Sequence, residues 1–239
     1  MTMGEPSSAW KDEATVRHPR IKICGLRTPE AVDAVLRRGG PEVGFVHFAR
    51  SPRHLSLPDM VALRAYVGDR AAVTVVTVDP DDALLEAIRR DVRPDTIQLH
   101  GSETAGRVAE IGRRTGLATM KALSVHDARD IAAVAAYRGI ADRLLLDAKA
   151  PKGAALPGGN GVAFDWRLLA GLPPGLDYML SGGLTPDNVG AAIRQAVPPG
   201  LDVSSGVESA PGVKDIDRIN QFFDAVLAAS QPLEGRRAS

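Results

Sequence analysis

The sequence offers very little sulfur chemistry, because only one cysteine occurs in 239 residues. A single cysteine excludes an intrachain disulfide and any zinc site built from several thiolates. Lys and Arg together number 29, as do Asp and Glu, so no excess charge favours nucleic acid or an anionic membrane. No apolar run approaches the roughly 20 residues needed to span a bilayer. These absences favour a cytoplasmic protein in a reducing compartment, with neither a nucleic-acid nor a membrane partner.

The residues that are present are sufficient for one large folded domain. Apolar residues make up 44% of the chain, and α/β barrels commonly have this length. No linker or shift in composition divides residues 21–229, which are therefore expected to form the domain. Residues 1–20 lack the apolar stretch of a signal peptide and are expected to be a polar, poorly ordered lead-in. Residues 230–239 are expected to be a frayed tail.

Apolar, β-branched runs alternate with longer stretches of helical period, a pattern typical of parallel strands joined by helices. Strands are predicted at residues 21–24, 43–48, 72–78, 96–99, 119–123, 143–147, 178–181 and 201–203. Helices are predicted at residues 29–38, 58–67, 82–89, 103–114, 127–137, 166–170, 186–195 and 215–228. The units repeat at roughly 26 residues, as in a (β/α)8 barrel. An open doubly wound sheet is the competing fold. The predicted class is α/β, a single-domain TIM barrel with eight parallel strands.

The first unit places a reactive side chain at the end of a strand. This strand ends on Cys24, and a turn at Gly25 leads to Thr28 at the N-cap and Pro29 at the first position of a helix. Side chains alternate along a strand, so Lys22 shares a face with Cys24. If that face looks inward, Cys24 lies at the mouth of the barrel, where such folds carry their active sites.

Other strand ends supply polar side chains to the same mouth. The pairs that share a face are Gln98 with His100, Arg143 with Asp147, and Asp202 with Ser204. A thiol at Cys24 and a carboxyl at Asp147 that meet across the mouth suit general acid–base catalysis. Alternatives remain open: Cys24 could be an inert packing residue, Asp147 an ion-pair partner or helix cap, and His100 a satisfied core histidine.

A lysine inside the barrel requires a partner, because an isolated buried ammonium is costly. In a closed barrel the eighth strand lies beside the first, which makes Asp202 the natural candidate for Lys22. We therefore predict a contact between these two side chains.

Two glycine-bearing loops predict a phosphate site. Gly182 and Gly183 follow the seventh predicted strand and precede a helix start, and Ser205 and Gly206 follow the eighth. Glycines let the backbone approach an anion, and loops seven and eight of barrel enzymes often bind phosphate. Residues 49–56, which concentrate positive charge, and 148–163, which are rich in glycine, form long loops at the same end. The second is a candidate mobile lid, with a surface insertion as the alternative.

Taken in order, several motifs resemble those of phosphoribosylanthranilate isomerase over residues 20–228. They are Lys22-Ile-Cys-Gly-Leu26, Gly44-Phe-Val with Ser51-Pro-Arg53, Gln98-Leu-His-Gly101, Leu146-Asp147, Phe164-Asp-Trp166, Gly182-Gly-Leu184, Asp202-Val-Ser-Ser-Gly-Val-Glu208 and Pro211-Gly-Val-Lys-Asp215. The resemblance implies a cofactor-independent, metal-free isomerase of tryptophan biosynthesis. Its reaction converts N-(5-phospho-β-D-ribosyl)anthranilate to 1-(2-carboxyphenylamino)-1-deoxy-D-ribulose 5-phosphate by an Amadori rearrangement.

The resemblance also implies a role for individual residues. Asp147 matches the general acid, Cys24 the general base, and Arg53 the arginine that binds the anthranilate carboxylate. His100 and Asp202 are expected to contact the substrate. The phosphate is expected at Gly182, Gly183, Ser205 and Gly206. Ser181 stands where a small apolar residue is more common, and His47 and His54 receive no catalytic role.

Two other interpretations remain open at this point. Another sugar-phosphate barrel is possible, such as an indole-glycerol-phosphate synthase with Lys121 as its catalytic lysine, or a pentose-phosphate epimerase with a metal-binding His and Asp set. A barrel that senses a phosphorylated ligand without turnover is the third. The expected partner is a small-molecule sugar phosphate, and the expected assembly is a monomer or homodimer.

Overall fold

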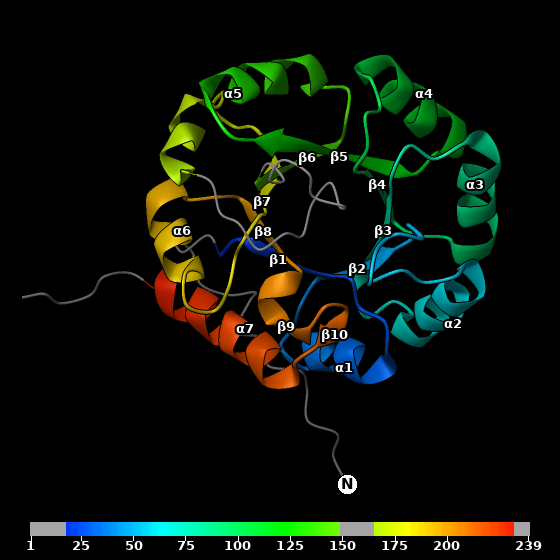
Figure 1. The fold of residues 1–239 in the computed structure, drawn as a ribbon, viewed down its shortest axis with the longest axis horizontal. Coiled ribbons are helices and arrows are strands. Elements are labelled where there is room, and N and C mark those ends of the chain that lie inside the picture. Colours follow the sequence, from blue (N-terminus) through cyan, green and yellow to red (C-terminus); the bar gives the residue numbers. More distant parts are fainter. Residues whose placement is uncertain (1–17, 149–164, 232–239) are drawn as a thin grey trace, which may run out of the picture.

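The computed structural model describes residues 18–148 and 165–231. Eight parallel strands form a closed barrel in the order of the chain, and helices surround it (Figure 1). The strands are β1 (Arg20–Cys24), β2 (Glu42–Val46), β3 (Ala72–Thr77), β4 (Thr96–Leu99), β5 (Ala118–Val125), β6 (Arg143–Ala148), β7 (Tyr178–Leu180) and β8 (Gly200–Val203). Pairing of β1 with β8 closes the ring, with Lys22 in register with Asp202. The predicted TIM barrel is confirmed, and the open sheet is excluded.

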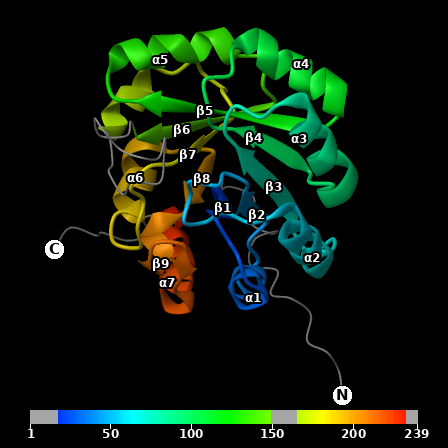
Figure 2. The same ribbon diagram turned by 45° about the vertical axis from the view of Figure 1, so that its right-hand side comes forward.

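The helices lie outside the strands, as a second view shows (Figure 2). They are α1 (Pro29–Arg37), α2 (Leu57–Val67), α3 (Asp82–Ala87) with the π-helical η1 (Ile88–Val92), α4 (Ala105–Thr115), α5 (Ala128–Val134) with the 3₁₀ segment η2 (Ala135–Tyr137), the 3₁₀ helix η3 (Trp166–Gly171), α6 (Val189–Ala196), the 3₁₀ segment η4 (Ser205–Val207) and α7 (Ile216–Ser230). The side chain of Thr28 accepts a hydrogen bond from the backbone N–H of Ala31, and Pro29 opens α1, as predicted.

The sixth predicted helix is present at Trp166–Gly171 and is a 3₁₀ helix. Two local expectations were wrong. A short antiparallel hairpin, β9 (Glu208–Ala210) and β10 (Val213–Lys214), lies in the segment predicted as a loop after the eighth strand. The helix predicted to start at residue 186 starts at Val189, because the amide of Asn188 instead binds the backbone of the preceding loop.

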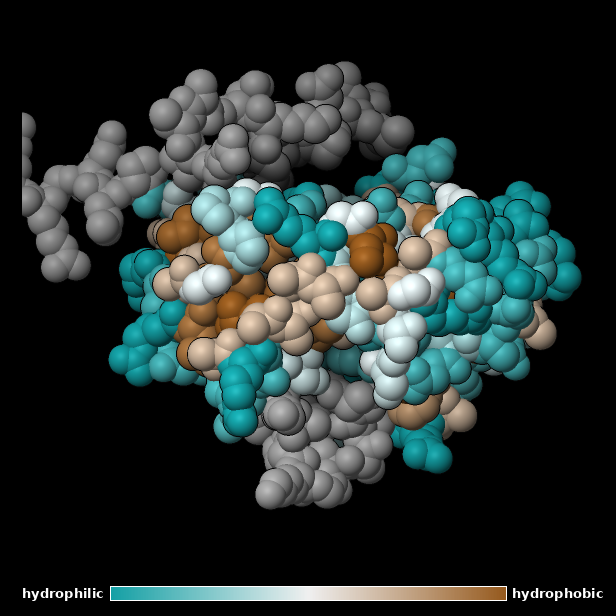
Figure 3. Space-filling model, turned by 90° about the horizontal axis from the view of Figure 1, so that it is seen from above, coloured by the Kyte–Doolittle hydropathy of each residue, from teal (hydrophilic) through white to brown (hydrophobic). Residues whose placement is uncertain are grey.

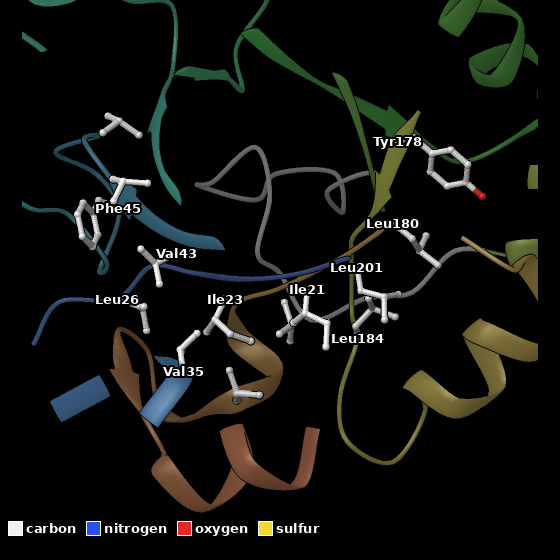
Figure 4. Packing of buried hydrophobic residues seen from close by; sticks show 14 of the residues in the cluster. Ile21, Ile23, Leu26, Val35, Val43, Phe45, Tyr178, Leu180, Leu184 and Leu201 are labelled. Carbon is white, nitrogen blue, oxygen red and sulfur yellow. The ribbon is translucent and has the colours of Figure 1, made fainter. Parts of the chain in front are cut away.

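Strand alternation separates a core outside the barrel from polar groups inside it. Ile21 and Ile23 of β1 extend toward α1 and α7 and pack among buried hydrophobic residues (Figure 4). Lys22 and Cys24, on the opposite face, look into the barrel, where both are buried. The midsection of the interior is filled by a separate apolar cluster of Met120, Ala122, Leu145 and Met179. One face of β1 therefore packs in the hydrophobic core, and its other face lines the barrel interior.

A partly buried ion pair lies at the amino-terminal end of the barrel interior. Arg143 of β6 reaches across to Glu42 of β2, with Nη1 2.7 Å from Oε2 and Nη2 3.2 Å from Oε1. Thr74 of β3 donates its hydroxyl to the same carboxylate at 2.5 Å. All three side chains thus satisfy one another.

The surface is mixed, with hydrophobic side chains between hydrophilic ones on the face in Figure 3. Within the described ranges, no helix has both the length and the apolar character needed to cross a membrane. The expected lead-in, glycine-rich loop and tail fall largely on residues 1–17, 149–164 and 232–239, outside the described residues.

Candidate active site

A pocket opens at the carboxyl ends of the barrel strands, the end at which barrel enzymes build their sites. It encloses about 710 Å³ of space, a value that includes volume open to solvent. Seven of the eight strand ends or their following loops line it. Its polar lining residues are Cys24, Ser51, Arg53, Gln98, His100, Asp147, Ser181, Asp202, Ser204 and Ser205, with Gly182 and Gly183.

Cys24 lies at the end of β1, and Gly44 of the neighbouring strand leaves space beside its side chain. A Cβ added at Gly44 of β2 would lie 3.0 Å from Sγ of Cys24 and 3.1 Å from Cε of Lys22. Burial raises the pKa of the Cys24 thiol. Nearby cations oppose this increase in part; they are Lys22, Lys214 and Arg53. The thiol is therefore a strong base once it is ionised.

Lys22 meets Asp202 inside the barrel, as alternation predicted. Its Nζ lies 2.6 Å from Oδ1 of Asp202 and 2.9 Å from Oε1 of Gln98. Burial lowers the pKa of Lys22, but Asp202 and Cys24 more than compensate, and the net direction is upward. Ser181 donates to the other oxygen of Asp202 at 3.2 Å. Lys22 thus stays a cation beside Cys24.

Asp147 of β6 lines the same pocket as Cys24 and is almost fully buried. Its Oδ2 lies 3.3 Å from Nε2 of His100. A Cβ at Gly182, whose φ is +87°, would lie 2.3 Å from the backbone nitrogen of Ala148 and 2.9 Å from Oδ1 of Asp147. Only glycine fits both the conformation and the space, so Gly182 helps to position this carboxyl group.

Arg53 enters the pocket from the loop after β2, held by a buried carboxylate. Its Nε and Nη2 donate to Glu208 at 2.7 and 2.9 Å. Lys214 of β10 donates to the same carboxylate at 2.8 Å. Burial works against the charge on Glu208, but these two cations hold its pKa below its usual range. The trio carries a net positive charge, because two cations share one anion.

The loops after β7 and β8 are in close contact with one another. A Cβ at Gly206 would lie 1.8 Å from the carbonyl oxygen of Leu184, so only glycine permits this approach. Within residues 18–148 and 165–231, the backbone N–H groups of Gly182 and Gly183 donate to no protein acceptor. Free N–H groups in such a turn suit an anion.

Comparison with known proteins identifies the family. A family model described as N-(5'-phosphoribosyl)anthranilate (PRA) isomerase matches residues 21–225. The N-(5'-phosphoribosyl)anthranilate isomerase of Brucella canis is 54% identical over 219 residues, covering 91% of this chain and 98% of that protein. The chain belongs to the N-(5'-phosphoribosyl)anthranilate isomerase family.

Solved structures of this family share the fold. The phosphoribosyl anthranilate isomerase of Thermotoga maritima has 32% identity and a TM-score of 0.79, with 88% of this chain and 99% of that chain covered. A second isomerase structure, in complex with reduced 1-(o-carboxyphenylamino)-1-deoxyribulose 5-phosphate, has 30% identity and a TM-score of 0.75 over 88% of this chain and 99% of that one. The predicted enzyme class, an isomerase, is confirmed by these relatives.

The structure brings nearly all of the predicted site residues to one pocket. The residues that line it are Cys24, Arg53, His100, Asp147, Gly182, Gly183, Asp202 and Ser205. Gly206 is buried and is not among the lining residues, and it permits the two loops to touch. Their roles in isomerase chemistry remain proposals. The two unassigned histidines lie near each other, and His47 contacts the backbone oxygen of Leu55 at 2.9 Å.

Sequence analysis assigned no role to three residues that bind or position side chains of the site. Gln98 was placed on the inward face without a function, and Glu208 and Lys214 entered only as parts of a motif. Two of them have partners distant in sequence, because Glu208 binds Arg53 and Gln98 binds Lys22, whereas Lys214 binds Glu208 within the same hairpin. Alternation along β4 could have indicated Gln98, whereas Lys214 depends on the hairpin that the sequence did not reveal.

The competing interpretations find less support at this site. Lys121 lies outside the pocket lining, and its Nζ donates to the carbonyls of Leu99 and Gly101 and to Glu103 at 3.3, 2.7 and 2.7 Å. A fully engaged ammonium is poorly suited to catalysis. Among the described residues, no group of three or more His, Cys, Asp and Glu side chains is arranged to hold a metal ion.

Proposed function

We propose that this chain catalyses the isomerisation of N-(5-phospho-β-D-ribosyl)anthranilate to 1-(2-carboxyphenylamino)-1-deoxy-D-ribulose 5-phosphate in tryptophan biosynthesis. The observation that carries this proposal is the shared pocket of Cys24 and Asp147, which lies beside two glycine-bearing loops and an arginine. Family membership and the bound product analogue of a relative support the substrate class.

In the proposed mechanism Asp147 acts first, as the general acid. It donates its proton to the furanose ring oxygen, the bond between that oxygen and C1 breaks, and the nitrogen lone pair forms a Schiff base at C1. Cys24, as thiolate, then removes the proton from C2, and the electron pair moves to form an enolamine. The enolamine tautomerises to the ketone as C1 gains a proton and the C2 hydroxyl loses one.

The proton balance closes over the cycle, because Asp147 loses one proton and Cys24 gains one. Transfer of one proton from thiol to carboxylate through water restores both groups. No nucleophile or redox partner is required. Two charged substrate ends held on opposite sides of the pocket would fix the sugar between acid and base, which is how orientation lowers a barrier.

Each end of the substrate has a counterpart in the pocket. Arg53 uses Nε and Nη2 for Glu208, which leaves its Nη1 group for the anthranilate carboxylate. The net positive charge of Arg53, Lys214 and Glu208 favours that anion. The proposed phosphate site consists of Ser205 and the N–H groups of Gly182 and Gly183, which donate to no acceptor among the described residues, and Gly206 lets these loops meet. His100 and Asp202 are proposed to contact the sugar.

We further propose that residues 21–229 form the single catalytic domain and that the enzyme works in the cytoplasm without a cofactor, as a monomer or homodimer. The span from β1, which begins at Arg20, to α7, which ends at Ser230, is consistent with that domain.

A turnover assay tests the proposal directly. Fluorescence of freshly prepared substrate should fall when the wild-type enzyme is added, and it should persist with Cys24→Ser, because a hydroxyl is a far poorer base than a thiolate. We expect a loss of about 10²-fold or more in kcat, in the range of general-base catalysis. Unchanged fluorescence with the wild-type enzyme would reject the function. Near-normal turnover by Cys24→Ser would reject Cys24 as the base.

A further inference from the structure

A line of polar contacts crosses the barrel from the side of Cys24 to Asp147. It begins at Asp202 of β8, whose Oδ1 lies 2.6 Å from Nζ of Lys22 on β1. The same Nζ lies 2.9 Å from Oε1 of Gln98 on β4. Nε2 of Gln98 then lies 3.1 Å from Nδ1 of His100, and Nε2 of His100 lies 3.3 Å from Oδ2 of Asp147. Four strands are thereby connected.

Lys22 fixes the orientation of the Gln98 side chain. An ammonium group can only donate, so the group of Gln98 that faces Lys22 must be its carbonyl oxygen, Oε1. Gln98 is 1% exposed and Lys22 is fully buried, so water cannot readily substitute for either partner. The amide nitrogen of Gln98 is consequently directed at His100.

The orientation of the amide fixes the histidine in turn. An amide NH2 group can only donate, so Nδ1 of His100 must accept and cannot carry a proton. A neutral imidazole has one protonated nitrogen, which leaves the proton on Nε2. That N–H group is the one that faces the carboxyl group of Asp147.

We propose that Gln98 is a positioning residue, which holds His100 as the neutral tautomer protonated at Nε2 and thereby allows Asp147 to carry the proton that it donates. The proposal rests on the proposed function, in which Asp147 is the general acid. Gln98 acts through His100 and does not itself need to contact the reacting atoms.

The charge of His100 determines what Asp147 can do. An imidazolium requires a proton on Nδ1, which would face the NH2 group of Gln98 with no acceptor between them. If His100 were nevertheless a cation, its charge at 3.3 Å would stabilise the carboxylate form of Asp147 and remove the proton needed for ring opening. A neutral ring contributes an N–H group without that charge.

The same arrangement assigns the two carboxyl oxygens of Asp147. The N–H group of His100 faces Oδ2, so Oδ2 acts as acceptor and the transferable proton resides on Oδ1. Oδ1 is the oxygen beside Gly182, on the side of the loop after β7. The proton donor is therefore directed toward the pocket wall where the phosphate is proposed to bind.

Gln98→Glu is the informative variant. It preserves the shape of the side chain but replaces the NH2 group, which donates to His100, with a carboxylate oxygen, which can only accept. In Gln98→Glu, one carboxylate oxygen still accepts from Lys22, while the other offers an acceptor to Nδ1 of His100. The ring should then take a proton on Nδ1. We expect kcat to fall about tenfold or more, within the contribution of one proton-transfer group, while KM changes less than about threefold.

Nitrogen NMR measures the tautomer without reference to activity. In the wild-type protein, ¹⁵N shifts of His100 should show Nδ1 unprotonated and Nε2 protonated at neutral pH. The chain has five histidines, and the His100→Gln variant identifies the signal by its loss. In Gln98→Glu, Nδ1 should become protonated. A wild-type ring protonated at Nδ1, or doubly protonated, would overturn the proposal.

A double-mutant comparison distinguishes positioning from structural damage. In the His100→Gln background there is no tautomer to set, so Gln98→Glu should change kcat by less than about threefold. The same tenfold loss in both backgrounds would overturn the proposal. An inactive wild-type enzyme with the expected nitrogen pattern would reject the proposed function alone, because the assigned tautomer would still hold.

Discussion

Buried charges occupy both ends of the barrel interior, but only one end is arranged for chemistry. At the amino-terminal end, Arg143, Glu42 and Thr74 use their polar atoms on one another. At the carboxyl end, Cys24 and Asp147 border an open pocket. The same strand alternation delivers polar groups to both ends. The difference is that Cys24 and Asp147 border a pocket that a substrate could enter, whereas the carboxylate of Glu42 is already bound by Arg143 and Thr74.

Removal of the proposed acid should give the largest effect. Asp147→Asn keeps the shape of the side chain but has no transferable carboxyl proton, so kcat should fall about 10³-fold, equivalent to about 4 kcal/mol. Steady-state kinetics measure the loss, and the melting temperature should change little. A variant that retains more than about a tenth of the wild-type kcat would contradict the role of Asp147.

Glu42, at the amino-terminal end of the barrel, is the carboxylate to compare with Asp147. Glu42→Gln should destabilise the protein by about 2 kcal/mol, because it leaves the guanidinium of Arg143, whose side chain is only 16% exposed, without its anion. Urea unfolding measures this change, and kcat per folded molecule should stay within about twofold of the wild type. If kcat fell as it does in Asp147→Asn while stability held, the distinction between the two ends would be wrong.

Gly44 leaves space beside the thiol of Cys24. Gly44→Ala adds a methyl group at 3.0 Å from Sγ of Cys24, so the thiol must move. We expect kcat to fall about tenfold, because a small misplacement of a catalytic group is costly. Gly112→Ala is the control, since its added Cβ meets only the methyl group of Thr119 at 3.3 Å, far from the pocket lining. Equal kcat for both variants would show that the position of Cys24 does not matter.

The pH dependence sharpens the role of Cys24. Burial raises the pKa of this thiol above its ordinary value of 9.0, so the thiolate fraction grows as pH rises through neutrality. The wild-type reaction also needs a protonated Asp147, so the thiolate is followed in Asp147→Asn, where that carboxyl group is absent. If the thiolate is the base, the residual kcat/KM of Asp147→Asn should increase about tenfold per pH unit between about pH 7 and pH 9. A residual profile that stays flat over this interval would contradict an ionisation of Cys24 in the reaction.

Much of this arrangement could be predicted from the sequence because it follows from local periodicity. The eight strands, the N-cap at Thr28 and the pairing of Lys22 with Asp202 depend on alternation and on closure of one ring. Residues 205–214 were harder to predict, because Glu208 of the hairpin β9–β10 binds both Lys214 and Arg53, and Arg53 is remote in sequence.

The orientation of Gln98 required the structure for the same reason. Its inward face was predictable, but its partners on β1 and at the end of β4 depend on distances across the barrel. The need for glycine at positions 44 and 182 is likewise a tertiary feature, because an added Cβ would meet Cys24 in one case and Ala148 and Asp147 in the other.

The structure of the complex with reduced 1-(2-carboxyphenylamino)-1-deoxyribulose 5-phosphate tests the central claim most directly. The account predicts the phosphate on the N–H groups of Gly182 and Gly183, the carboxylate at Arg53, and the sugar between Sγ of Cys24 and the carboxyl group of Asp147, each within about 3.5 Å of a sugar atom. A ligand whose sugar contacts only one of these two groups would contradict it.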